Sequence, residues 1–160
     1  MRLNSFSRAT SLLPLLLLAT SAASSQTITM TLNPPMSVMG KRGTTATAKV
    51  QARLREGYHC NSNTPSDEYL IPLKLTWTSP AGVQIADVKY PKPSMEKYAF
   101  SDKPLSVYSG TFDIVTEFKI PADAKPGQTT VSGKLKYQAC DERACYPPKT
   151  LDVQFPLIVE

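Results

Sequence analysis

Alternating apolar residues, proline-rich turns and the lack of a helical pattern predict an all-β protein, an immunoglobulin-like antiparallel β-sandwich. In several stretches the apolar residues recur at every second position, which is typical of strands with one face in a core. Turn signals with Pro, Gly, Asn or Asp separate these stretches. No segment carries a long, capped apolar stripe at helical spacing.

The first four candidate strands occupy the N-terminal half of the chain. They are ITMTL from Ile28, ATAKVQARL from Ala46, LIPLKLTWT from Leu70 and GVQIADVKY from Gly82. The third is the clearest, because one face would carry Ile71, Leu73, Leu75 and Trp77. Turn signals separate the four strands: NPP at Asn33, KRGT at Lys41, NSNTPSDE from Asn61 and SPAG from Ser79.

Three further strands are predicted in the C-terminal half, after the turn signal PKPS at Pro91. TFDIVTEFKI from Thr111 places apolar residues on one face, and the signal PADAKPGQ follows it. The last two strands alternate most regularly, over residues 131–139 and 151–159. Seven strands joined by short turns indicate a sandwich with no second domain and no internal repeat.

Composition and charge describe an ordinary globular protein. Of 160 residues, 41% are hydrophobic and 19% charged, with 14 Pro and 7 Gly, which excludes a disordered or collagen-like chain. The formal charge is +5, and it falls to (18 − 2) − 13 = +3 without Arg2 and Arg8 of the export segment described next. So small a charge argues against a nucleic-acid partner.

The first residues have the pattern of a secretory signal peptide, over residues 1–25. Arg2 and Arg8 form a basic region, an apolar run extends from Leu12 to Leu18, and small residues follow. The run is shorter than the ~20 residues that span a bilayer. Cleavage after Ala23 and cleavage after Ser25 both fit. We therefore expect a domain over residues 26–160, exported to the periplasm without membrane insertion, where disulfides are permitted.

The cysteines carry the chemistry that the sequence indicates. In LKYQACDERACYPPKTLDV, Cys140 ends one predicted strand and Cys145 stands before the next. Flanking positions of a hairpin lie at Cα distances of ~4.5–5.5 Å, which a disulfide accepts. A crosslink stabilises least when its loop is short, so the spacing favours a two-electron switch over a permanent staple. The residues alone leave both interpretations open.

Three segments resemble the N-terminal domain of the thiol:disulfide interchange protein DsbD and its stand-alone relatives. They are GYHCNSNTPSDEYLIPLKLTW, YPKP and LKYQACDERACYPPKT, and the resemblance covers residues 26–159. Its most specific part is YQ-A-C followed shortly by C-Y-P-P. The resemblance implies an immunoglobulin-like periplasmic domain whose two cysteines shuttle electrons. Such a domain is a thiol:disulfide oxidoreductase, and the sequence leaves open whether it acts as an enzyme or as an electron carrier.

The resemblance also implies partners. The donor would be a thioredoxin-fold protein or a DsbD/CcdA-like membrane reductase, and the acceptor a periplasmic disulfide isomerase or a cytochrome-maturation protein. We expect the donor to be a separate polypeptide, because this sequence has no membrane segment after the leader and no C-x-x-C motif. The spacing departs from the best-known DsbD domain, with four residues between the cysteines in place of five.

Carried over by motif, Cys145 is the sulfur that attacks the partner's disulfide, and Cys140 resolves the mixed disulfide. The family covers its pair with an aromatic cap loop, and KYAFSDKPLSVY places Phe100 in the cap position. Tyr146 is expected at a docking surface because it follows Cys145. The two prolines after it would stiffen the chain there.

The third cysteine and the remaining candidates indicate less. Cys60 fits a small buried hydrophobe at a strand end better than a third redox residue or a metal ligand. His59 is the one histidine, which excludes a blue-copper site, although a looser Cu(I) site with methionine ligands stays open. The sequence shows no nucleophile elbow or triad order around His59, so we expect no hydrolytic site, and we expect neither metal nor cofactor. The rival to the redox function is a binding or assembly module whose Cys140–Cys145 bond is permanent.

Overall fold

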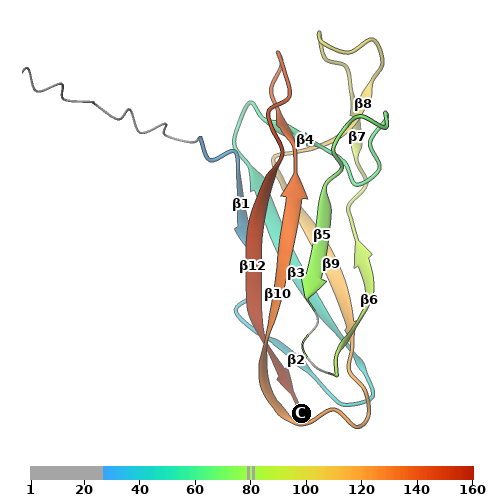
Figure 1. Cartoon of the computed structure of the whole chain (residues 1–160), viewed down its shortest axis with the longest axis vertical. Coiled ribbons are helices and arrows are strands. Elements are labelled where there is room, and N and C mark those ends of the chain that lie inside the picture. The colour runs from blue at the N-terminus through green and yellow to red at the C-terminus, as the bar shows by residue number, and fades with distance from the viewer. Residues whose placement is uncertain (1–26, 79, 81) are drawn as a thin grey trace, which may run out of the picture.

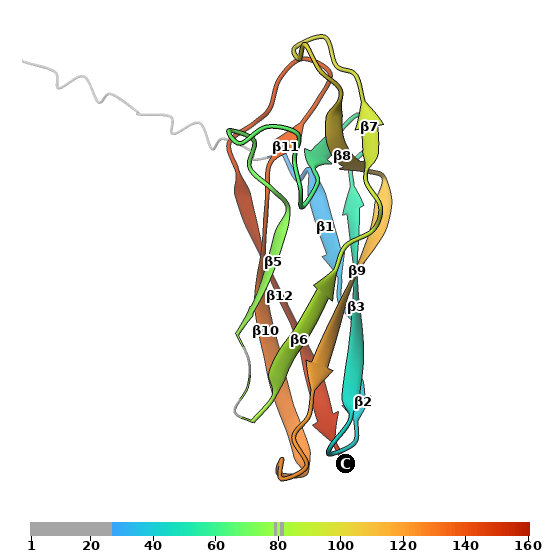
Figure 2. The same ribbon diagram turned by 90° about the vertical axis from the view of Figure 1, so that its right-hand side faces the viewer.

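The computed structural model describes residues 27–78, 80 and 82–160, and this part of the chain is all β, without helices. The predicted signal peptide, with its cleavage positions after Ala23 or Ser25, lies outside the described residues. Three four-stranded sheets form an immunoglobulin-like β-sandwich, as the sequence predicts. Two larger sheets face each other, and a smaller one lies at the end opposite the C-terminus (Figures 1 and 2).

The first larger sheet has the order β1-β3-β9-β6 and is antiparallel throughout. Its strands are β1 (Met30–Asn33), β3 (Thr45–Leu54), β9 (Thr111–Lys119) and β6 (Gln84–Lys89). Exposed and buried residues alternate along the whole of β3, which is the period-two pattern of a strand with one face in a core.

The second larger sheet has the order β2-β12-β10-β5. Its strands are β2 (Val38–Gly40), β12 (Lys149–Val159), β10 (Gly127–Tyr137) and β5 (Lys74–Thr78). The long hairpin of β10 and β12 is paired from Gly127↔Val159 to Tyr137↔Lys149. The short strand β2 runs parallel to β12, which is an exception to the predicted antiparallel arrangement.

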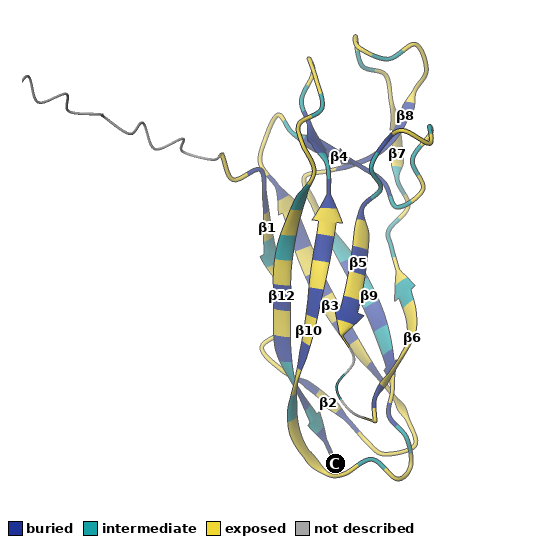
Figure 3. Ribbon diagram, viewed as in Figure 1, coloured by how far each residue is buried: buried dark blue, intermediate teal, exposed yellow. Residues whose placement is uncertain are grey.

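The core lies between these two sheets, where buried and exposed residues alternate along the strands (Figure 3). Trp77 is one of its members. The indole ring meets Phe118 and Phe155 edge to face, at centroid distances of 5.6 and 5.5 Å. Its Nε1–H donates a 2.9 Å hydrogen bond to the Thr116 hydroxyl, so the one polar atom of the ring is satisfied. Gly133 is paired with Trp77 and has no room for a side chain, since a Cβ would lie 2.4 Å from the ring.

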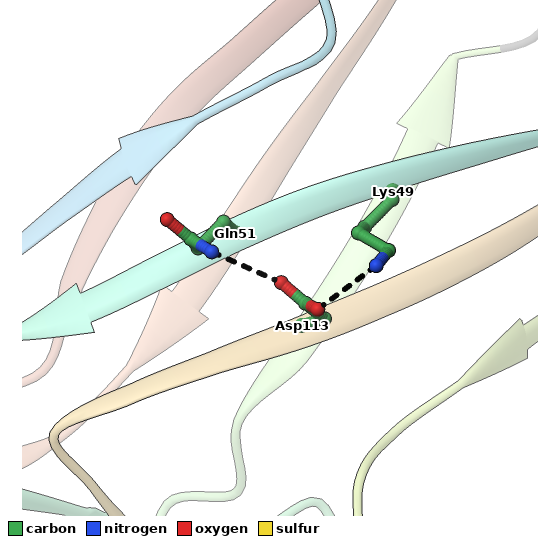
Figure 4. Close-up of polar contacts among 3 residues, drawn as sticks. All are labelled: Lys49, Gln51 and Asp113. Atoms are coloured by element: carbon green, nitrogen blue, oxygen red, sulfur yellow. Dashed lines mark hydrogen bonds and ion pairs between the residues drawn. The ribbon is translucent and has the colours of Figure 1, made fainter.

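The outer face of the first sheet is polar. On β3 and β9, the Lys49 Nζ lies 3.2 Å from the Asp113 carboxylate, and Gln51 Nε2 donates to the same carboxylate at 3.4 Å (Figure 4). Exposed pairs of this kind contribute little to stability. Burial of the alternating apolar faces is therefore what holds the two larger sheets together.

The third sheet has the order β11-β4-β8-β7 and consists of short strands. They are β11 (Ala139–Cys140), β4 (His59–Asn61), β8 (Leu105–Ser109) and β7 (Ser94–Glu96). We call this sheet and its adjoining loops, residues 59–73, 94–109 and 138–148, the tip, and the two larger sheets the body. The tip has its own small cluster of buried apolar residues, namely Leu70, Leu105 and Val107 with Tyr98 against them.

All seven predicted strands are present, with shifted ends. The first begins at Met30 instead of Ile28, and the strand predicted to reach residue 139 ends at Tyr137. Of the turn predicted from Ser79, two residues lie outside the described part. The sequence did not predict β2, β4, β7, β8 or β11, each of five residues or fewer. Among the described residues, no helix is long and apolar enough to cross a membrane.

Candidate functional site

The chain leaves the body at Gln138, between β10 and β11. Beyond Tyr137 it no longer pairs with β12 and pairs instead with β4, through Ala139↔Cys60 and Cys140↔His59. The Gln138 side chain fixes this change of sheet, because its Oε1 accepts hydrogen bonds from Asn61 Nδ2 at 3.0 Å and from the Ile71 amide at 3.3 Å. The hairpin tip that follows is thereby anchored to the third sheet.

Cys140 and Cys145 form a disulfide at this hairpin tip. The S–S distance is 2.01 Å, and the two residues make an isolated antiparallel bridge. Their Cα atoms lie 3.9 Å apart, so the predicted spacing of ~4.5–5.5 Å was wrong. The regular spacing does not apply because the pair stands outside the ladder, where both arms of the hairpin converge on a short turn.

Asp141 organises the turn between the two cysteines. Its amide donates to the Ala144 carbonyl at 3.0 Å, and its Oδ1 accepts from the amides of Arg143 at 2.8 Å and Ala144 at 3.0 Å. Its Oδ2 accepts from the Tyr146 hydroxyl. The Tyr146 hydrogen bond, followed by those from the two amides, lowers the pKa of Asp141 to about 2. The same bond to Asp141 raises the pKa of Tyr146 to about 12.

The two sulfur-bearing residues differ in exposure. Cys140 is fully buried, whereas Cys145 is half-buried. Cys145 also lines a cavity of about 210 Å³, together with Phe100, Leu70, Gln138 and neighbouring residues. A molecule that approaches the bridge from outside therefore reaches Cys145 first.

The predicted cap residue lies beside this cavity. Phe100 is 38% exposed and stacks on Tyr98, with a centroid distance of 5.5 Å. Tyr98 in turn stacks on His59 at 3.9 Å. The structure thus brings Phe100 and Cys145 to one cavity and adds a stack of three rings that the sequence did not indicate.

Tyr146, the predicted docking residue, lies on the surface of the hairpin tip and is 39% exposed. Its ring faces Tyr58 at a centroid distance of 6.0 Å. The two rings line a second cavity, of about 430 Å³, with Ala139, Pro147 and Lys149 among its walls. Cys145 thus lines the first cavity, and the next residue, Tyr146, lines the second.

His59 is the residue of the site that sequence reasoning missed. It is 4% exposed and pairs directly with Cys140 across the third sheet. Burial lowers the pKa of His59 to about 4, against the opposing effect of Asp141, so the ring is neutral at neutral pH. A lone histidine in GYHCN gives no sequence signal for this pairing, because the pairing is made across the sheet with a residue far along the chain.

Cys60 belongs to the core and not to the site. It is fully buried, lies within the main apolar cluster and pairs with Ala139, which confirms the prediction of a small buried hydrophobe. Burial raises the pKa of its thiol to about 12, so the thiol is not ionised at neutral pH. Among the described residues, no three His, Cys, Asp or Glu side chains form a group that could hold a metal ion.

The fold and the site together define a class of protein. It is an immunoglobulin-like domain with a disulfide at a hairpin tip, bordered by an aromatic loop. The family model described as "Thiol:disulfide interchange protein DsbD, N-terminal" matches residues 29–156. The chain belongs to this family of thiol:disulfide interchange domains.

A solved structure supports the fold. The N-terminal periplasmic domain of ScsB from Proteus mirabilis matches with a TM-score of 0.56 and 15% sequence identity, over 86% of this chain and 49% of that chain. The chain thus spans about half the length of that structure. A family 123 glycoside hydrolase from Clostridium perfringens matches with a TM-score of 0.33 and 16% identity, over 83% of this chain and 28% of that chain, which is too weak for any inference. No curated protein matches the chain.

Proposed function

We propose that the chain is a periplasmic thiol-disulfide exchange domain that relays reducing equivalents through Cys140 and Cys145. The domain comprises residues 26–160, exported by a signal peptide over residues 1–25. A thioredoxin-like domain or a DsbD/CcdA-like membrane reductase reduces the bridge. The resulting dithiol then reduces a disulfide in an exported partner, such as a disulfide isomerase or a cytochrome-maturation protein.

The observation that carries this proposal is the position of the bridge at the end of the molecule, with one sulfur-bearing residue accessible and the other buried. This asymmetry suits the two steps of disulfide exchange. Cys145 attacks the partner disulfide from the cavity beside Phe100, and a mixed disulfide forms. Cys140 then attacks the Cys145 sulfur, which re-forms the bridge and releases the partner as a dithiol.

Opening the bridge is compatible with a folded domain. The disulfide closes a loop of only six residues, for which the chain-entropy model gives a stabilisation of about 2 kcal/mol. A typical domain is stable by about 5–15 kcal/mol. Both redox states of the chain should therefore keep the core cluster that contains Trp77, to which neither Cys140 nor Cys145 belongs.

The test is a redox titration of the purified chain in glutathione and dithiothreitol buffers, followed by thiol alkylation. A Cys60→Ala background leaves the bridge as the source of all thiols. We expect two thiols to appear at a potential near those of thioredoxins and disulfide isomerases, between about −120 and −270 mV, with unchanged far-UV circular dichroism. A potential well below about −300 mV, or unfolding on reduction, would favour the permanent crosslink and overturn the relay.

The roles of the two cysteines are tested by trapping mixed disulfides with a thioredoxin-fold partner protein. In the Cys60→Ala background, Cys140→Ala should accumulate the mixed disulfide through Cys145. Cys145→Ala is the matched control and should trap far less, because Cys140 is buried. Equal trapping by both variants, or trapping only by Cys145→Ala, would contradict the assignment.

A further inference from the structure

Strand β4 carries two buried polar atoms without a partner. Among the described residues, the buried side-chain atoms that lack a hydrogen bond are His59 Nε2 and Asn61 Oδ1, and both lie on this three-residue strand. Leaving such an atom unpaired typically costs about 1–3 kcal/mol. Asn61 has a structural role, because its Nδ2 donates hydrogen bonds to Gln138 Oε1 and to the Ile71 carbonyl. His59 has no corresponding bond in the described part of the chain.

His59 and Cys140 lie directly opposite each other on antiparallel strands. Such residues point to the same face of a sheet, with Cβ atoms ~4.5–5.5 Å apart, which brings an imidazole within reach of a cysteine sulfur. Tyr98 covers the ring from one side at 3.9 Å. Both residues of the pair are buried, at 4% and 0% exposure. The residue paired with His59 across the sheet is therefore one whose chemistry changes with the redox state.

We propose that His59 is a positioning residue for the redox pair: in the reduced protein, its Nε2 accepts a hydrogen bond from the Cys140 thiol, and this bond favours the dithiol state. The inference rests on the proposed function, since it needs a bridge that opens. In the disulfide, the Cys140 sulfur has no proton to donate, so the nitrogen stays unpaired. In the dithiol, the S–H group and the nitrogen satisfy each other without solvent.

The chemical step balances as follows. A dithiol reductant gives two electrons to the bridge and becomes a disulfide. The S–S bond breaks, and the two protons of the reductant end on Cys140 and Cys145. The hydrogen bond to His59 forms only with the first of these thiols. It therefore stabilises one side of the equilibrium, which a group that only packs would not do.

The ring is in the state that the proposal needs. Burial lowers the pKa of His59 to about 4, while the charge of Asp141 acts in the opposite direction. At neutral pH the imidazole is therefore neutral and has one acceptor nitrogen. Acceptance by Nε2 requires the tautomer with its proton on Nδ1, which is a property that can be measured.

The test compares the reduction potential of the Cys60→Ala chain, which keeps His59, with those of the same chain carrying His59→Phe or His59→Gln. His59→Phe keeps an aromatic ring against Tyr98 but has no hydrogen-bond acceptor. The disulfide form no longer buries an unpaired nitrogen, and the dithiol form loses its hydrogen bond. Both changes favour the disulfide and so lower the reduction potential. We expect the equilibrium constant with glutathione to shift about tenfold toward the disulfide, which corresponds to about −30 mV for a two-electron couple. His59→Gln offers a carbonyl oxygen and should restore part of this shift.

The background has its own control, the unsubstituted chain. Cys60→Ala changes the neighbouring residue of β4, which belongs to the core cluster, and should leave the potential of the bridge at the value of the unsubstituted chain. An unaltered potential in His59→Phe, or equal shifts in Phe and Gln variants, would overturn the proposal. The titration involves no partner protein. If the bridge of the Cys60→Ala chain is reduced at the expected potential and His59→Phe has the same potential, this inference alone is refuted. A wild-type bridge that cannot be reduced refutes the proposed function itself.

A second measurement needs no substitution at His59. Nitrogen-15 spectra of the imidazole in the Cys60→Ala protein report the tautomer and the hydrogen bonding of each nitrogen. We expect Nε2 to resonate as an unprotonated, weakly bonded nitrogen in the disulfide and to move toward the range of hydrogen-bonded acceptors on reduction. A protonated Nε2 in the reduced protein, or no change on reduction, would contradict the proposal even if His59→Phe fails to fold.

Discussion

The body and the tip of this molecule satisfy their buried groups in different ways. In the body, the polar atom at the centre of the core is paired, since the Trp77 indole donates to Thr116 among edge-to-face aromatic rings. In the tip, strand β4 leaves His59 Nε2 and Asn61 Oδ1 unpaired, and a fully buried sulfur stands beside the histidine. The body follows the usual rule for buried polar groups, and the tip departs from it.

This difference indicates a division of labour along the long axis of the sandwich. The body has long paired strands and one continuous core, whereas the tip has short strands and a separate small cluster around Leu105. Local departures from satisfied packing are expected where function requires them. We therefore expect substitutions in the body to change the stability of the fold, and substitutions in the tip to change the behaviour of the disulfide.

The largest effect is expected in the body, for Phe118→Ala. The side chain is fully buried and packs against Trp77 and Phe155, so its removal leaves a cavity. We expect a loss of about 3–5 kcal/mol in the free energy of unfolding. Urea denaturation of the oxidised chain measures it. The reduction potential of the folded protein should stay at the wild-type value.

The control for this variant is Met36→Ala, because Met36 is 95% exposed and its loss should change neither quantity. A shift in the reduction potential of Phe118→Ala under conditions where it remains folded would show that body and tip are coupled. In that case the division of labour would be wrong.

A smaller loss is expected for Gly133→Ala, which adds one carbon atom to the same core. The new Cβ would lie 2.4 and 2.8 Å from atoms of the Trp77 ring and 2.9 Å from the Thr76 carbonyl oxygen, so the ring or the strand has to move. Overpacking of this kind typically costs about 1–3 kcal/mol. Thermal and urea unfolding measure it, and the near-UV circular dichroism of Trp77 should change. A variant as stable as the wild type would mean that the core is looser than the contacts indicate.

How far the sequence predicts the structure follows the same boundary between body and tip. In the body, period-two alternation identified every long strand, because each has one buried and one exposed face. In the tip, β4 is buried at all three positions and β8 at four of five, so their sequences show no alternation. The signal that predicts strands is absent where a short strand is covered on both sides.

The candidate site was likewise predicted in part. The motif around Cys140 and Cys145 pointed to the bridge, and the aromatic segment pointed to Phe100, which shares a cavity with Cys145. The place of His59 opposite Cys140 depends on a pairing between residues far apart in the chain. No local pattern encodes such a register, since it is set by how the hairpin leaves the body at Gln138.

The smallest effect on stability is expected in the tip, for Phe100→Ala. The side chain is 38% exposed, and its closest aromatic neighbour is Tyr98 at 5.5 Å. An aromatic pair of this kind contributes about 0.5–1.5 kcal/mol, which is the loss we expect in unfolding experiments.

Phe100→Ala should have a larger effect on the rate at which the bridge is reduced, because Phe100 and Cys145 border one cavity. If stacking on Tyr98 holds Phe100 over the bridge, its loss opens the approach to Cys145. The ~0.5–1.5 kcal/mol of the Phe100–Tyr98 pair then corresponds to a rate increase of about two- to tenfold. Stopped-flow reduction by dithiothreitol measures this rate, with Met36→Ala as the control, since Met36 is exposed and lies outside the tip, between β1 and β2. Reduction could instead be slower, or it could proceed at an unchanged rate although the variant loses the expected stability. Either result would mean that the aromatic loop does not control access and that burial of Cys140 alone protects the tip.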